Sequence, residues 1–145
     1  MKSFWVDVNV WLALSSGRHA HYQAAHQWFD TVGPAQAAFC RLVQLAYLRL
    51  LTNPRVMGPD VLSPREAWRA YDELCGDVRV TFVGEAAGAA TAFRRLSPRL
   101  AGSPGNWTDA WLAALAEAHE LTIVSFDRGF QRLPGVDARL LSSRV

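Results

Sequence analysis

The sequence has almost no lysine, little cysteine and no long apolar run. Of its fifteen basic residues only Lys2 is a lysine, so reactions that need a lysine in the site are excluded. The two cysteines, Cys40 and Cys75, are too few for a disulfide framework and wrongly spaced for a zinc site. No stretch of about 18 uncharged apolar residues occurs, so no membrane span is expected. Because the N-terminus also does not look like a signal peptide, we expect a soluble, cytoplasmic protein.

The net charge is small as well. A formal charge of +2 over 145 residues neither requires a nucleic-acid partner nor excludes one. Half of the residues are hydrophobic, and a chain of this length is expected to fold as a single domain, residues 1–145, around a large core. No internal repeat or low-complexity segment divides the chain.

Short apolar segments alternate with amphipathic ones along the chain. The alternation predicts strands at 3–8, 37–39, 78–83, 122–125 and 138–141. It predicts helices at 10–15, 20–32, 42–51, 64–74, 85–96 and 107–118. The segment 53–64 contains three prolines and is expected to be a loop, ending in Ser63 and Pro64 as the start of the next helix. Alternating helices and nearly continuous apolar strands favour an α/β fold with a parallel sheet between two helical layers.

Two aspartates follow predicted strands. Asp7 interrupts the otherwise apolar run FWVDVNVWLAL, and Asp127 comes just after the strand TIVS. Because binding sites in parallel sheets form at the carboxyl ends of the strands, we expect both side chains at the same edge. Asp109 lies in the first turn of the predicted helix 107–118, which the fold would bring to that edge.

Each of these aspartates also has an ordinary structural explanation. Asp7 could cap the helix that follows it, Asp109 could be stabilised by the helix dipole, and Asp127 could be a turn residue. Three carboxylates at one edge, however, repel one another unless a cation is bound. Hard oxygen donors suit Mg²⁺ or Mn²⁺, which can activate a water molecule and stabilise charge on a phosphate ester. The expected chemistry is therefore phosphodiester hydrolysis.

The order of the motifs resembles that of the PIN-domain ribonucleases, specifically the VapC-type toxins of bacterial toxin–antitoxin pairs. The matching motifs are D-x-N after the first strand, WTDAWLAALA around Asp109 and IVSFDRGF around Asp127. The similarity also includes HAHYQAAHQWF and QLAYLRLLTNP, so it extends over essentially the whole chain. It implies a PIN-like, Rossmann-like fold, which is a three-layer α/β/α sandwich with a short central parallel sheet.

The resemblance also implies an activity and its residues. The protein would be a Mg²⁺-dependent endoribonuclease, with Mn²⁺ able to substitute, acting as a toxin. The catalytic, metal-binding residues would be Asp7, Asp109 and Asp127. Asn9 and Ser125 would orient these carboxylates or a water molecule, and Thr108 would be a polar neighbour of Asp109. The implied partners are an RNA substrate, a cognate antitoxin that covers the acidic edge, and a second copy of the chain in a homodimer.

Two departures from the family pattern reduce the number of acids. The helix 42–51 has no acid where many PIN enzymes carry a glutamate; the matching position lies near Ala46, and Gln44 is the nearest neutral polar residue. Gly129 stands where the family often has a second acid after Asp127. We therefore expect one metal ion rather than two. The alternative function is a catalytically weak or inactive PIN-like module that binds RNA or a protein partner.

A second enzyme class has an aspartate nucleophile after the first strand, as in phosphatases and receiver-like domains. Asp7 fits that position, but Asn9 stands where the phosphatase pattern D-x-D needs another acid. Both classes use a lysine near the phosphate, and Lys2 comes too early in the chain to supply it. An acyl-phosphate on Asp7 would be the evidence for this class.

Histidine and tryptophan residues near the N-terminus raise two further alternatives. His19, His21 and His26 have the wrong spacing for a metal site on one helical turn, so surface or capping roles are expected. Trp11 and Trp28 lie on the first two helices, and either core packing or contact with a partner is possible for them.

Overall fold

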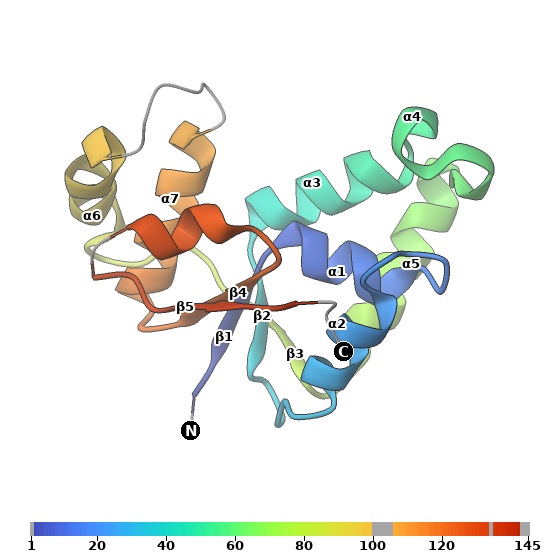
Figure 1. Cartoon of the computed structure of the whole chain (residues 1–145), viewed down its shortest axis with the longest axis horizontal. Helices are drawn as coiled ribbons and strands as arrows, with labels where there is room; N and C mark the ends of the chain where they lie inside the picture. The colour runs from blue at the N-terminus through green and yellow to red at the C-terminus, as the bar shows by residue number, and fades with distance from the viewer. Residues whose placement is uncertain (1, 100–105, 134, 143–145) are drawn as a thin grey trace.

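A five-stranded, fully parallel sheet runs through the centre of the molecule (Figure 1). The computed structural model describes residues 2–99, 106–133 and 135–142. The strand order is β3-β2-β1-β4-β5. The strands are β1 (Phe4–Val6), β2 (Ala37–Phe39), β3 (Val80–Phe82), β4 (Thr122–Ser125) and β5 (Ala138–Leu140).

Helices cover both faces of this sheet. In Figure 1, α6 and α7 lie to one side of the sheet, and α1, α2, α3 and α5 lie to the other. This arrangement confirms the predicted three-layer α/β/α fold with a short parallel sheet. The α-helices are α1 (Val8–Ser15), α2 (Tyr22–Phe29), α3 (Arg41–Leu51), α4 (Pro54–Met57), α5 (Pro64–Cys75), α6 (Ala89–Leu96) and α7 (Asn106–Ala118). Short 3₁₀ segments are η1 (Gly58–Asp60), η2 (Ser97–Arg99) and η3 (Arg128–Arg132).

None of the helices in the described part of the chain has the length and apolar character needed to cross a membrane.

Aromatic side chains fill the core between the layers. All residues of β1, β2 and β4 are buried, because these central strands are covered on both faces. Trp11 of α1 stacks on Phe39 of β2 with ring centroids 4.0 Å apart, and Trp28 of α2 packs edge-on against Phe4 at 5.5 Å. Both tryptophans are therefore core residues. The edge strands β3 and β5 are only partly buried.

The prediction of a loop at 53–64 is wrong for its first half. Asn53 caps α4 by accepting a hydrogen bond from the N–H of Arg55 at 3.0 Å, and Pro54 occupies the first helical position. The pair Asn-Pro thus starts a helix for the same reason as Ser-Pro at the start of α5. That second start is confirmed as a reciprocal capping box between Ser63 and Glu66.

Several helix boundaries also differ from the prediction, including those of α2, which spans Tyr22–Phe29 rather than 20–32. Helix α6 begins at Ala89 rather than at Glu85, because Gly88 adopts a left-handed conformation with φ of +88°. Residues 84–88 instead form a loop after β3. Strand β1 ends at Val6, since Asp7 already caps α1, which begins two residues before the predicted start.

Candidate active site

The parallel strands β1 and β4 place their following residues at one edge of the sheet. Val6 is paired with Val124, and the backbone N–H of Asp7 donates to the Val124 carbonyl at 2.9 Å. Asp7 and Ser125 therefore lie side by side at the carboxyl end of the sheet. Asp127 follows two residues later, and Asp109 lies in the first turn of α7, which contacts β4.

The Ser125 hydroxyl links the residues at this edge. Its oxygen lies 2.6 Å from Asp7 Oδ2, 2.9 Å from the backbone N of Asp127 and 3.2 Å from Asn9 Nδ2. The last two groups donate, so the hydroxyl accepts from both of them and its own proton points to Asp7. All three hydrogen-bonding positions of the hydroxyl are used. Ser125 is only 2% exposed, which shields the network from water.

The Asn9 side chain is fixed by its second hydrogen bond. Its Oδ1 accepts from the backbone N–H of Phe126 at 3.2 Å, which leaves Nδ2 to donate to Ser125. Residues Asn9, Ser125 and Asp7 are thus joined into one network, and their roles in a reaction stay a prediction. Thr108 is exposed in the first turn of α7, beside Asp109 in sequence, and its role stays a prediction.

Burial and mutual repulsion perturb the carboxylates. Asp7 is 9% exposed, and desolvation by burial raises its pKa to about 6, although hydrogen bonds from Ser125 and from the backbone of Val8 oppose the rise. The charges of Asp109 and Asp127 raise the Asp7 pKa further. Burial and then the charge of Asp127 raise the pKa of Asp109. Each carboxylate is therefore close enough to the other two to repel them.

The donor chemistry fits a hard divalent cation. Asp7 uses one lone pair on each oxygen for Val8 and Ser125, and a carboxylate has about four acceptor positions. In residues 2–99, 106–133 and 135–142, no group of three or more His, Cys, Asp or Glu side chains is already arranged to hold a metal. Mg²⁺, however, usually takes one or two protein carboxylates and keeps several waters, so it does not require a closed cage.

Gln44, the polar residue nearest the acid-free position on α3, and Gly129 both form hydrogen bonds. Gln44 is buried on α3 and accepts a hydrogen bond from Arg41. The Gly129 N–H donates to Asp127 Oδ1 at 2.8 Å, so that Asp127 caps η3. The structural explanations of Asp7 and Asp127 as caps are thus confirmed, and both residues still lie at the acidic edge.

One contact near the site was not predicted from the sequence. The ring of His21 stacks on Phe126, between Ser125 and Asp127, with centroids 4.3 Å apart and planes 16° from parallel. His19 Nδ1 accepts from the His21 backbone at 3.0 Å, which is a local capping role as expected. The segment before α2 therefore packs against the loop that carries Asp127, and no spacing in the sequence indicates this contact.

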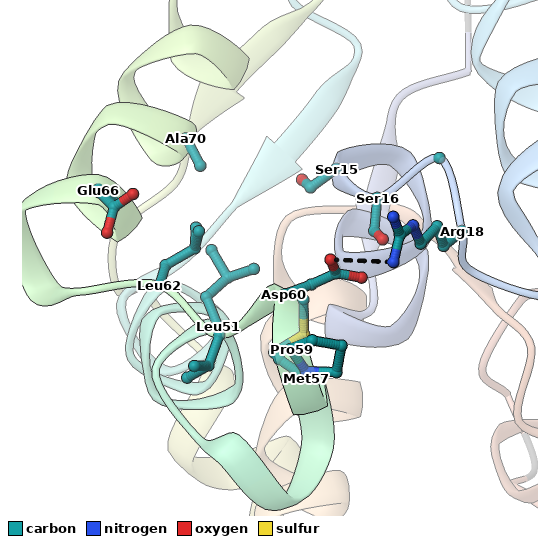
Figure 2. A pocket seen from close by; sticks show the side chains of 12 residues that line it. Ser15, Ser16, Arg18, Leu51, Met57, Pro59, Asp60, Leu62, Glu66 and Ala70 are labelled. Atoms are coloured by element: carbon teal, nitrogen blue, oxygen red, sulfur yellow. Dashed lines mark ion pairs between the residues drawn. The ribbon is translucent and has the colours of Figure 1, made fainter.

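A cavity of about 500 Å³ lies beside the end of α1 (Figure 2). It is formed by the end of α1, the loop after it, and α3, α4, η1 and α5. Leu51, Met57 and Leu62 give it an apolar wall, and Arg18 and Asp60 form an ion pair across it at 3.5 Å. None of the three aspartates lines this cavity, so its size does not make it the catalytic site.

Comparison with known proteins agrees with the geometry. Residues 5–136 match the family model of the PIN domain. The chain is 38% identical over 141 residues to ribonuclease VapC41 of Mycobacterium tuberculosis, covering 94% of this chain and 97% of the relative. It is 32% identical over 136 residues to ribonuclease VapC31 of the same organism, covering 92% and 94%.

Solved structures share the fold at low sequence identity. VapBC2 from Rickettsia felis, bound to a DNA fragment from its promoter, superposes with a TM-score of 0.69 at 13% identity and covers 96% of this chain and 98% of its own. VapC20 of Mycobacterium tuberculosis, a toxin that cleaves the sarcin–ricin loop, gives 0.64 at 19% identity and covers 86% and 90%. With the family model and the close relatives, these matches establish that the chain belongs to the PIN-domain family and, within it, to the VapC type.

Proposed function

We propose that the protein is a Mg²⁺-dependent endoribonuclease, with Mn²⁺ able to substitute, and that it is the toxin of a toxin–antitoxin pair in the cytoplasm. The observation that carries the proposal is the Ser125-linked network at the sheet edge, which joins Asp7 to Asp127 beside Asp109. The similarity to proteins named ribonucleases supports it.

The residues of the site would have different roles in the reaction. The carboxylates of Asp7, Asp109 and Asp127 would hold the metal. When bound, a divalent ion lowers the pKa of a water molecule and offsets charge on the phosphodiester. Ser125 fixes Asp7 Oδ2 against the backbone of Asp127, so these two acids keep their positions when RNA enters. Asn9 holds the Ser125 hydroxyl and the Phe126 backbone in the same arrangement.

The proposed partners are an antitoxin and a second copy of the chain. Structures that share this fold include VapBC complexes from Rickettsia felis and Salmonella typhimurium, in which a VapB protein accompanies the toxin. We propose that the antitoxin of this chain covers the acidic edge and blocks RNA. Light scattering of the purified protein, alone and with its antitoxin, tests both assemblies.

The alternative function is a PIN-like module that binds RNA or a protein without cleaving it. It is favoured by the acid-free helix α3 and by Gly129, both of which reduce the negative charge available to a metal. A module of this kind should show no metal-linked gain in stability, whereas an ion bound to the folded state raises the melting temperature by mass action.

The test is a cleavage assay with antitoxin-free protein. Total cellular RNA is incubated with Mg²⁺ or Mn²⁺, with EDTA as the metal-free control. The variants are Asp109→Asn and, as a matched control, Asp72→Asn, which neutralises an exposed carboxylate on α5. The melting temperature of each protein is measured with and without metal.

Cleavage that requires metal, is lost in Asp109→Asn and is retained in Asp72→Asn supports the proposed function. Cleavage that survives EDTA, or an Asp109→Asn variant as active as the wild type, contradicts the assigned site. Absence of cleavage together with an unchanged melting temperature in metal favours the binding module.

A further inference from the structure

A second cavity, of about 310 Å³, lies at the carboxyl end of β2 and β3. Its wall includes Arg41 just after β2, Phe82 at the end of β3, Glu85 in the loop after β3, and Trp111 of α7. In the order β3-β2-β1-β4, β2 is the direct neighbour of β1, which leads to Asp7, and β4, which leads to Asp127, lies on the other side of β1. Adjacent strands are about 5 Å apart, so β2 lies about 5 Å and β3 about 10 Å from β1.

Helix α7 connects the cavity to the acids. Asp109 lies in its first turn, and Trp111, in the second turn, lines the cavity. The cavity and the acids therefore lie at the same, carboxyl edge of the sheet. A strand of RNA whose phosphate lies at the acids would bring a neighbouring base within reach of the cavity.

Hydrogen bonds hold the walls of this cavity in place. The Val83 N–H donates to the Phe39 carbonyl at 2.8 Å, which pairs the end of β3 with β2. His119, just after α7, donates from Nε2 to the Gly84 carbonyl at 2.7 Å and so fixes the loop that carries Glu85. Because Gly88 stops α6 from extending backwards, this loop is free to form a wall rather than a helical turn.

An aromatic ring and a guanidinium form one part of this wall. Phe82 is 44% exposed, so part of its side chain is accessible to a ligand in the cavity. The Arg41 guanidinium carbon lies 5.3 Å from the centre of the ring, and the buried Gln44 carbonyl accepts a hydrogen bond from this guanidinium. Planar bases of unpaired RNA stack on both aromatic rings and guanidinium planes.

Glu85 adds a charge that distinguishes among bases. A carboxylate accepts hydrogen bonds from an exocyclic amino group, such as cytosine N4, and repels the carbonyl oxygen that uracil has at the same place. Arg41, which lines the same cavity, can attract the RNA backbone. An aromatic and cationic surface beside one carboxylate suits a nucleobase better than a purely apolar ligand.

We propose that this cavity is a base-binding subsite, which holds an unstacked, amino-bearing base of single-stranded RNA next to the cleaved phosphate. The proposal rests on the ribonuclease function proposed above. The base stacks on the surface formed by Phe82 and Arg41, and Glu85 accepts a hydrogen bond from its amino group. Base stacking on an aromatic side chain is worth about 1–3 kcal/mol, so removing the ring should weaken binding by about 5- to 150-fold.

The test measures binding separately from cleavage. Fluorescence anisotropy gives the Kd of fluorescently labelled oligocytidylate and oligouridylate of equal length in EDTA, where metal-dependent cleavage does not occur. The variants are Phe82→Ala, Phe82→Trp, which retains a stacking surface, and Glu85→Ala. Trp68→Ala is the matched control, because it removes a similarly exposed aromatic side chain, 47% against 44%, on a helix that does not line the cavity. Melting temperatures show that each variant is folded.

We expect wild type to bind oligocytidylate more tightly than oligouridylate. Phe82→Ala should weaken oligocytidylate binding by the factor given above, Phe82→Trp should restore it, and Trp68→Ala should leave it unchanged. Glu85→Ala should remove the preference for cytosine. An unchanged Kd of Phe82→Ala for oligocytidylate would overturn the subsite. A Phe82→Ala variant that binds RNA normally and loses only its affinity for a purified antitoxin would overturn it as well. If wild type binds RNA as expected but cleaves none with metal, the ribonuclease proposal fails and the subsite does not.

Discussion

Replacing Asp7 by asparagine should stabilise the metal-free protein while it abolishes activity. The buried carboxylate has a pKa of about 6 instead of 3.8, mainly because burial disfavours its charge. This difference corresponds to about 3 kcal/mol of lost stability once Asp7 is ionised. Asparagine has a similar shape and is an equally good helix cap, but it carries no charge.

Part of this gain is offset by a lost hydrogen bond. Asp7 accepts from Val8 through Oδ1 and from Ser125 through Oδ2, and asparagine offers only one of these acceptors. A net hydrogen bond of this kind contributes about 1–2 kcal/mol. The net gain of Asp7→Asn is then about 1–2 kcal/mol, or about 3–6 °C in melting temperature for a chain of this size.

The gain in stability from Asp7→Asn should depend on pH. Because the folded-state pKa is raised, the stability linked to Asp7 is fully present below pH 3.8 and is lost as pH rises through about 6. The advantage of Asp7→Asn should therefore be small at low pH and complete above about pH 7. Thermal melts in EDTA across this range measure it, with Asp72→Asn, an exposed aspartate on α5, as the control.

Adding Mn²⁺ should make wild type more stable than Asp7→Asn, the reverse of the order in EDTA. Wild type gains by mass action if Asp7 is a ligand, whereas the asparagine variant has lost a charged donor. An Asp7→Asn variant that melts below wild type at neutral pH in EDTA would refute the reasoning, since desolvation would then not be the main influence on this carboxylate.

Three further predictions concern the surroundings of the site and one ion pair. Ser125→Ala should lower the free energy of unfolding by about 2–3 kcal/mol, because a buried carboxylate loses its donor; a change below about 0.5 kcal/mol in denaturant titrations would contradict this. Gly129→Asp should lower the metal-free melting temperature, since the new Cβ would lie 3.3 Å from Asp127 Oδ1. The same variant should show a larger increase in melting temperature when Mn²⁺ is added, and an increase equal to that of wild type would argue against a metal at Asp127. Asp77→Asn should cost about 1 kcal/mol at neutral pH, as Asp77 binds Arg79 at 2.8 Å. Hydrogen bonds from Arg79 lower the pKa of Asp77 from 3.8 to about 2, so wild type should lose its greater stability over Asp77→Asn as pH falls from about 3.8 to about 2. If the melting temperatures of the two proteins stay equally far apart over this range, this contribution of Asp77 is excluded.

The central part of the fold could be predicted from the sequence. The bounds of β2 and β4 agree with the prediction, because each is a short run of mostly apolar residues. The errors arose where one residue overrides a local preference. Gly88, with its positive φ, ends what the alanine-rich segment would otherwise continue as helix, and Asn53 caps a helix in a segment rich in proline.

The candidate site could be predicted only in part. The placement of Asp7 and Asp127 at one edge follows from parallel strands, and Asn9 and Ser125 came from the family resemblance. The hydrogen bonds of Ser125 to Asp7 and of Asn9 to Phe126 join residues that are more than 110 positions apart in sequence, so no spacing reveals them. The cavity beside Phe82 depends likewise on two strand ends and a helix that are distant in the chain.

The capping roles and the functional roles of the aspartates are not alternatives. Asp7 accepts from the first backbone N–H of α1, and Asp127 accepts from Gly129 in η3, as ordinary caps do. A cap, however, gains nothing from being buried, and serine or asparagine would fill the same role without a charge. Asp7 is instead ionisable, 9% exposed and repelled by two other acids. The cap fixes where the carboxylate lies, and the persistence of an unfavourable buried charge at that point is what a bound cation would explain.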